Sequence, residues 1–118
     1  MYGVPANLDL KFLHGAELTL VGLGLYRIHL HFHPEGIITI EGDWELRDET
    51  DILIDQDSWG PGREPYQLHK LLGRCVKATE VAAPESFELR FDSGHVLRVF
   101  DNSPEYESFS IQPGNIFV

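Results

Sequence analysis

Three histidines at alternate positions, His29, His31 and His33, are the residues whose type and spacing most readily suggest chemistry. Successive side chains of a β-strand point to opposite faces, so these imidazoles would share one face and the apolar residues between them the other. Two imidazoles two residues apart can reach one zinc ion. A three-residue turn after the strand would place His29 opposite Glu41 and His31 opposite Thr39, and the Glu41 carboxylate would supply an oxygen ligand. The pattern predicts a zinc site at His29, His31 and Glu41, in a metal-binding protein or a small metal-dependent hydrolase.

An ordinary strand with one solvated face has the same pattern. In a weak internal echo of this segment, the positions of the three histidines hold Glu88, Arg90 and Asp92. An arginine does not fit a duplicated metal site, so the echo favours a polar face without a cofactor.

The stretch 41–57 is the second candidate site, because it carries eight acidic residues and one arginine. Alternate carboxylates on one strand repel each other unless a cation or a basic partner neutralises them. The stretch therefore predicts a docking surface for a basic protein, and the nearby Trp59 would serve as an apolar anchor. The predicted surface consists of Glu41, Asp43, Glu45, Asp55, Asp57 and Trp59. The alternative is a charged edge that prevents aggregation, with Trp59 folded onto the core.

Composition limits the classes of partner and reaction. The chain of 118 residues has 19 acidic and 9 basic residues and a net charge of -10, which disfavours nucleic acid and anionic membranes. Cys75 is the only cysteine, and no apolar leader precedes Lys11, so we expect a cytoplasmic protein. Cys75 has no histidine near it in sequence, and no G-x-S-x-G elbow occurs, so we expect no catalytic residues and no enzyme.

Alternation of apolar and polar residues predicts a mostly β (α+β) fold. We expect an antiparallel curved sheet, rolled into a partial barrel or a sandwich, made of two similar β-hairpin units. One short helix is expected at about 65–72, ended by Gly73. The turn at 92–94 predicts that Leu89 pairs with Leu97 and Glu88 with Arg98.

The chain is short enough for a single domain, 1–118. Residues 10–15 are echoed by residues 68–73, which indicates either a duplication, at about 8–65 and 66–118, or convergence of two similar hairpins. Both ends carry apolar residues, at 2–5 and 116–118. These ends either close the sheet of the chain itself or pair in a homodimer.

Four segments, IEGDWEL (40–46), YQLHKLLG (66–73), FDSGHVL (91–97) and YESFSI (106–111), resemble a family of small bacterial domains of unassigned function. The resemblance implies a bacterial origin and one β-rich domain, and it assigns no catalytic residue. Small acidic domains of this kind often act as immunity-type or other binding proteins. The favoured prediction is a non-enzymatic acidic binding protein, of the type that inhibits a basic toxin or nuclease. The alternatives are the metal protein and a homo-oligomeric interaction domain.

Overall fold

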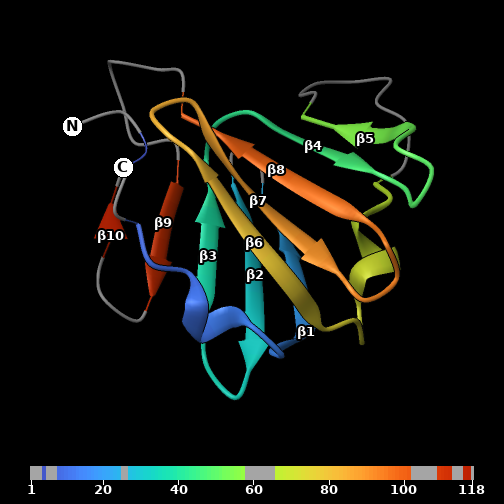
Figure 1. Ribbon diagram of the computed structural model, residues 1–118, viewed down its shortest axis with the longest axis horizontal. Helices are drawn as coiled ribbons and strands as arrows, with labels where there is room; N and C mark the ends of the chain where they lie inside the picture. The colour runs from blue at the N-terminus through green and yellow to red at the C-terminus, as the bar shows by residue number, and fades with distance from the viewer. Residues whose placement is uncertain are drawn as a thin grey trace.

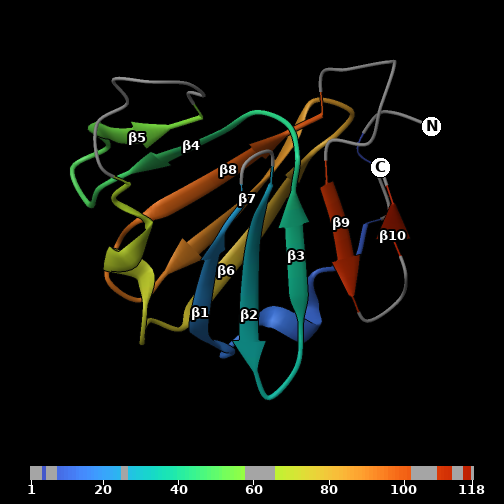
Figure 2. The same cartoon turned by 180° about the vertical axis from the view of Figure 1, so that it is seen from behind.

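The computed structural model describes residues 4, 8–24, 27–57, 66–101, 109–112 and 116–117. Its first sheet contains β1 (Glu17–Leu23), β2 (Ile28–His33), β3 (Ile37–Ile40), β9 (Phe109–Gln112) and β10 (Ile116–Phe117). Its second sheet contains β4 (Trp44–Arg47), β5 (Leu53–Gln56), β6 (Val76–Ala82), β7 (Ser86–Phe91) and β8 (Val96–Phe100). The strand orders are β1-β2-β3-β9-β10 and β5-β4-β8-β7-β6, and all pairings are antiparallel. The two sheets form two layers whose strands cross obliquely (Figures 1 and 2).

The mostly β prediction is confirmed, and the sheets form a sandwich rather than a closed barrel. The predicted helix is a single 3-10 turn, η2 (Leu68–Leu71), and a second such turn, η1 (Lys11–Leu13), precedes β1. Leu68 and Leu71 are both buried, because residues three apart share one side of a 3-10 helix. Gly73 follows with a φ of +80°, the left-handed conformation expected after a helix end. Within the described part of the chain, no helix is long and apolar enough to cross a membrane.

The core lies between the sheets and is built from the apolar residues of each alternating strand. In β2 the burial pattern puts Ile28, Leu30 and Phe32 inside and the histidines outside, as predicted. The largest fully buried side chains are Trp44, Phe87 and Phe91. Trp44 also stacks on Tyr66, with ring centroids 6.3 Å apart, so the segment before η2 is held against the core.

The alternating stretch 37–47 is divided between the two sheets. Its first part is β3, between β2 and β9, and its second part is β4, between β5 and β8. Gly42, in the connection between β3 and β4, is also buried, so every second residue faces the core throughout the passage from one sheet to the other. β9 and β10, which follow β8 in the chain, lie in the first sheet. The first half of the chain therefore adds β4 and β5 to the second sheet, and the second half adds β9 and β10 to the first (Figure 2).

Equivalent residues 58 positions apart make equivalent contacts where the halves meet, which fits the sequence echo. Gly15 N donates to Val76 O at 2.8 Å, and Gly73 N donates to Leu18 O at 2.9 Å. The local arrangement is therefore close to two-fold symmetric. A gene duplication as its origin stays a prediction.

The second hairpin has the predicted register, with Leu89 opposite Leu97 and Glu88 opposite Arg98. The predicted register of the first hairpin is wrong: His29 lies opposite Thr39, not Glu41, and His31 lies opposite Ile37. Phe32 N donates to Gly36 O at 2.8 Å, so Gly36 belongs to the ladder and the loop begins earlier than expected.

Gly36 explains this register physically. It has a φ of +126°, and a Cβ at this position would come within 2.9 Å of Leu13. The ladder approaches η1 so closely here that only glycine fits without displacement.

The apolar ends of the chain contact the chain itself. Val4 is buried, and its N–H donates to Pro84 O at 2.9 Å. In β10, Ile116 lies opposite Ile111 of β9. These ends therefore extend the chain's own core and first sheet, and a homodimer through them stays a prediction.

Candidate functional site

The histidines of β2 share the outer face of the first sheet. His29 and His31 are half-buried and His33 is exposed. The Nδ1 atom of His29 lies 3.0 Å from the Thr39 hydroxyl, the side chain directly across the strand pair. Glu41 lies beyond the end of β3 and forms an ion pair with Arg27 at 3.8 Å.

This geometry does not assemble the three predicted zinc ligands as the sequence suggested. The corrected register puts the Thr39 hydroxyl in front of His29, where the Glu41 carboxylate was expected. Among the described residues, no group of three or more histidine, cysteine, aspartate or glutamate side chains is arranged to hold a metal ion. Zinc binding through His29 and His31 stays a prediction for which the described residues offer no third ligand.

The predicted acidic residues separate into different surroundings. Asp55 is buried, and its carboxylate accepts hydrogen bonds from the backbone N–H groups of Gln56 at 2.9 Å and Gln67 at 2.7 Å. Gln67 is the residue immediately before η2, so the Asp55 side chain ties β5 to the start of this turn. Trp59 lies outside the described residues.

Asp43 and Asp57 form a pair of carboxyl groups where β4 begins and β5 ends. Burial, followed by the hydrogen bond with Asp43 and the negative charge of Asp43, raises the pKa of Asp57 to about 6. The Asp57 N–H donates to Trp44 O at 3.1 Å, which fixes the pair beside the first residue of β4. The negative charge of one carboxyl group this close disfavours ionisation of the other, so Asp57 takes up a proton more readily than an ordinary aspartate.

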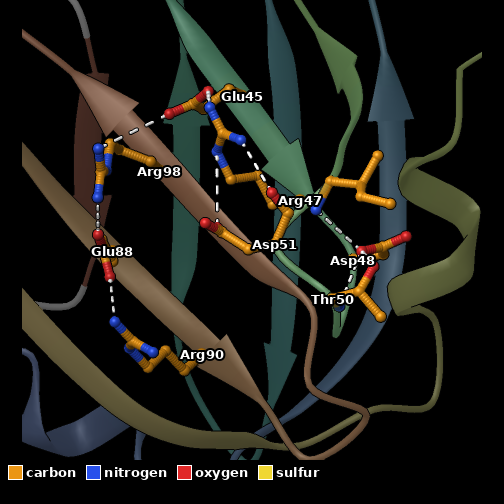
Figure 3. A network of polar contacts seen from close by, with 9 residues as sticks. Glu45, Arg47, Asp48, Thr50, Asp51, Glu88, Arg90 and Arg98 are labelled. Atoms are coloured by element: carbon orange, nitrogen blue, oxygen red, sulfur yellow. Dashed lines mark hydrogen bonds and ion pairs between the residues drawn. The ribbon is translucent and has the colours of Figure 1, made fainter.

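Glu45 belongs to a continuous ladder of alternating charges on the outer face of the second sheet (Figure 3). Its Oε2 atom accepts a hydrogen bond from Arg47 Nη2 at 3.1 Å, and its Oε1 atom lies 3.8 Å from Arg98 Nη1. Glu88 is nearly buried and accepts hydrogen bonds from Arg98 and, at 3.1 Å, from Arg90. The charge ladder consists of Arg90, Glu88, Arg98, Glu45, Arg47 and Asp51.

The charge ladder and Val96 line a groove with a volume of about 420 Å³. Sequence reasoning identified one of its contacts, the cross-strand pair of Glu88 and Arg98. It missed the contact between Glu45 and Arg98, which joins the two halves of the ladder, because β4 and β8 are far apart in the chain and nothing local indicates that they are neighbours. We call this feature the charged groove.

The turn between β4 and β5 is ordered by a single carboxylate. Asp48 Oδ1 accepts hydrogen bonds from the Thr50 N–H at 2.9 Å, the Thr50 hydroxyl at 2.7 Å and the Ile52 N–H at 3.0 Å. The hydrogen bond from the Thr50 hydroxyl is the largest cause that lowers the pKa of Asp48 below its usual value, and the bond from the Ile52 N–H is the next largest. Arg47 donates to the Asp51 carbonyl oxygen at 3.0 Å, which holds the far side of the turn.

Residues 48–53, which we call the acidic tip, combine charge with exposed apolar side chains. Ile52 is 59% exposed and Leu53 39%, and both follow Asp51 in the chain, whose side chain is 88% exposed. The turn between β7 and β8 packs against the tip, because a Cβ on Gly94 would lie only 2.6 Å from Glu49 Cβ. Neither exposed apolar residue was predicted as part of a site, although both follow the acidic run directly.

Comparison with known proteins identifies no relative. No family model matches the chain, and neither the curated proteins nor the solved structures contain a match. The resemblance to small bacterial domains of unassigned function therefore stays a prediction.

Proposed function

We propose that this protein is a non-enzymatic binding protein that captures a basic protein partner, in the manner of an immunity-type inhibitor. The observation that carries the proposal is the acidic tip. There, Glu49 and Asp51 precede Ile52 and Leu53 in the chain, and the fold leaves these two apolar side chains in solvent. Apolar anchors flanked by charge are typical of protein interfaces.

The order of the turn supports this function. The three hydrogen bonds accepted by Asp48 fix the turn before any partner arrives. Gly94, with a φ of +92°, lets the neighbouring turn pack against Glu49. A fixed binding element loses little conformational entropy on association, and this favours affinity.

The charge of the surrounding hairpin supports a basic partner. The stretch 41–57, which contains β4, β5 and the acidic tip, carries eight acidic residues and one arginine. β5 is the outermost strand of the second sheet, so the acidic tip, which precedes β5, lies at one edge of that sheet (Figure 1). A negative edge steers a positive surface towards the tip and accelerates the encounter.

Affinity purification from the native host, followed by mass spectrometry, tests this proposal. We expect the wild-type protein to capture a protein with a positive net charge, and Ile52→Asp to lose it. The matched control is Leu20→Asp, because Leu20 is 48% exposed but lies on β1 in the other sheet. A partner that Ile52→Asp still captures, or that is itself acidic, would contradict the proposal.

A further inference from the structure

The charged groove has its two kinds of charge at different depths. The side chains of Glu45 and Glu88 are only 14% and 7% exposed. Those of Arg47, Arg90 and Arg98 are 36%, 52% and 41% exposed. The carboxylates are therefore the more buried groups, which we call the floor, and they alternate with the more exposed arginines across the sheet (Figure 3). The groove therefore presents positive groups in a protein whose net charge is -10.

The floor carboxylates fix the position of these guanidinium groups. Glu88 receives Arg98 on Oε1 and Arg90 on Oε2, while Glu45 faces Arg98 with Oε1 and Arg47 with Oε2. Each carboxylate thus bridges two guanidinium groups, and the three arginines stand in a row across β7, β8 and β4. Arginines held in this way are pre-organised, so less entropy is lost when they bind a ligand.

Most N–H groups of these arginines have no acceptor within the described structure. A guanidinium carries five N–H donors in a planar fork. Arg90 and Arg98 each donate one hydrogen bond to a described residue, in both cases to Glu88. Apart from Arg98 Nε, which is buried, the remaining donors match the oxygen atoms of a carboxylate or a phosphate, which arginine binds with two parallel hydrogen bonds.

From these observations we infer that the charged groove binds an oxyanion, a carboxylate or phosphate group of a small molecule, over Arg90 and Arg98. Its volume of about 420 Å³ is within the range of small-molecule sites. The exposed carboxylates of Glu80 and Asp51 lie beside the arginines. Together with Glu45 and Glu88 they offset the three guanidinium charges, so the groove offers directed hydrogen bonds rather than net positive charge, which suits a small ligand and not a long polyanion such as nucleic acid. The inference does not rest on the proposed capture of a basic protein, although Asp51 belongs both to the groove and to the acidic tip.

Titration of the ¹⁵N-labelled protein, followed by NMR, tests the inference. The probes are inorganic phosphate and glutarate in separate arms, with sodium chloride at equal ionic strength as the reference. We expect saturable shifts of backbone amides in β4, β7 and β8 and of the arginine Nε–H groups. The Kd should be on the order of 1 mM, as expected for two or three charge-assisted hydrogen bonds. The arm with the lower Kd shows whether the group is a phosphate or a carboxylate.

Arg90→Gln and Arg27→Gln form a matched pair of variants. Each removes one positive charge from a side chain that is about half exposed, 52% for Arg90 and 55% for Arg27, and that pairs with a glutamate. We expect Arg90→Gln to raise the Kd at least about tenfold, since hydrogen bonds to charged groups are lost. Arg27→Gln should leave the Kd within about twofold, because Arg27 lies outside the groove.

Arg90→Lys keeps the charge but removes the planar fork. It replaces Arg90→Gln in the titration if Arg90→Gln does not fold. We expect weaker binding from this variant too. The inference is overturned if neither probe produces saturable shifts beyond those of sodium chloride. It is also overturned if the shifts lie away from β4, β7 and β8, or if Arg27→Gln weakens binding as much as the Arg90 variants.

Discussion

Replacing Glu88 with glutamine should destabilise the protein more than any other single neutralisation of a carboxylate in the charge ladder. Glu88 is 5% exposed and accepts hydrogen bonds from two arginines. Glutamine has nearly the same shape, but one carboxylate oxygen becomes an NH₂ group that points its protons at a guanidinium. The substitution therefore removes one hydrogen bond, weakens the other by removing the negative charge, and opens no cavity.

The size of the effect follows from the exposure of the partners. A hydrogen bond to a charged group contributes about 1.5–3 kcal/mol in a sheltered site. Arg98 and Arg90 are 41% and 52% exposed, so solvent screens both contacts. With this screening, we expect Glu88→Gln to lower the free energy of unfolding by about 1.5–2.5 kcal/mol.

Urea denaturation at pH 7, monitored by the fluorescence of the tryptophans, measures this free energy. Glu80→Gln is the control, because it also neutralises a partner of Arg90, at 3.7 Å, but its side chain is 64% exposed. Its cost should stay below about 0.5 kcal/mol. Equal costs for Glu88→Gln and Glu80→Gln would refute the view that the buried position of Glu88 makes the charge ladder stabilising.

Three further predictions follow from other parts of the structure. Asp57→Asn should increase stability by about 1 kcal/mol at pH 7 and by little below pH 4, in urea denaturation at both pH values. The pKa of about 6 in the folded state lies above the ordinary 3.8, so the advantage of the protonated form is lost as pH rises through 6. Gly94→Ala should cost about 1–3 kcal/mol in thermal unfolding, because it has a φ of +92° and contacts Glu49 closely. If β10 serves the chain's own sheet, the wild type should be a monomer in light scattering, and deletion of residues 116–118 should unfold it. A wild-type dimer that becomes a folded monomer would contradict that role.

Local alternation was sufficient to predict which residues face the core. In β2 the inward and outward faces are those that the sequence indicated, because one buried face imposes a period of two, and β3 and β4 show the same period. The register of the β7–β8 hairpin was also predictable, since its turn residues and the pairing of Glu88 with Arg98 agree. The β2–β3 register was not, because it depends on how closely Gly36 approaches η1, a contact outside the hairpin.

The candidate site was harder to predict, because its contacts join strands that are distant in the chain. Alternation continues unbroken through the buried Gly42, so nothing in the sequence shows that β3 and β4 belong to different sheets. As a result, Glu45 was grouped with Glu41, although it contacts arginines of β4 and β8. Asp55 was placed on the surface because carboxylates are rarely buried, whereas hydrogen bonds from two backbone N–H groups stabilise it inside.

The association rate constant with the captured partner, measured as a function of salt concentration, tests the central claim most directly. The claim is that the acidic tip attracts and binds a basic protein. We compare the wild type with Glu49→Lys/Asp51→Lys, and with Glu35→Lys/Glu85→Lys, which changes the net charge equally at exposed positions in other turns.

We expect the wild-type rate constant to fall at least about tenfold as salt screens the tip. The association rate constant of Glu49→Lys/Asp51→Lys should be low even at low salt and should depend little on salt. That of Glu35→Lys/Glu85→Lys should stay close to the wild-type value at every salt concentration. Equal rates for the two double variants, or a wild-type rate that does not depend on salt, would contradict the account.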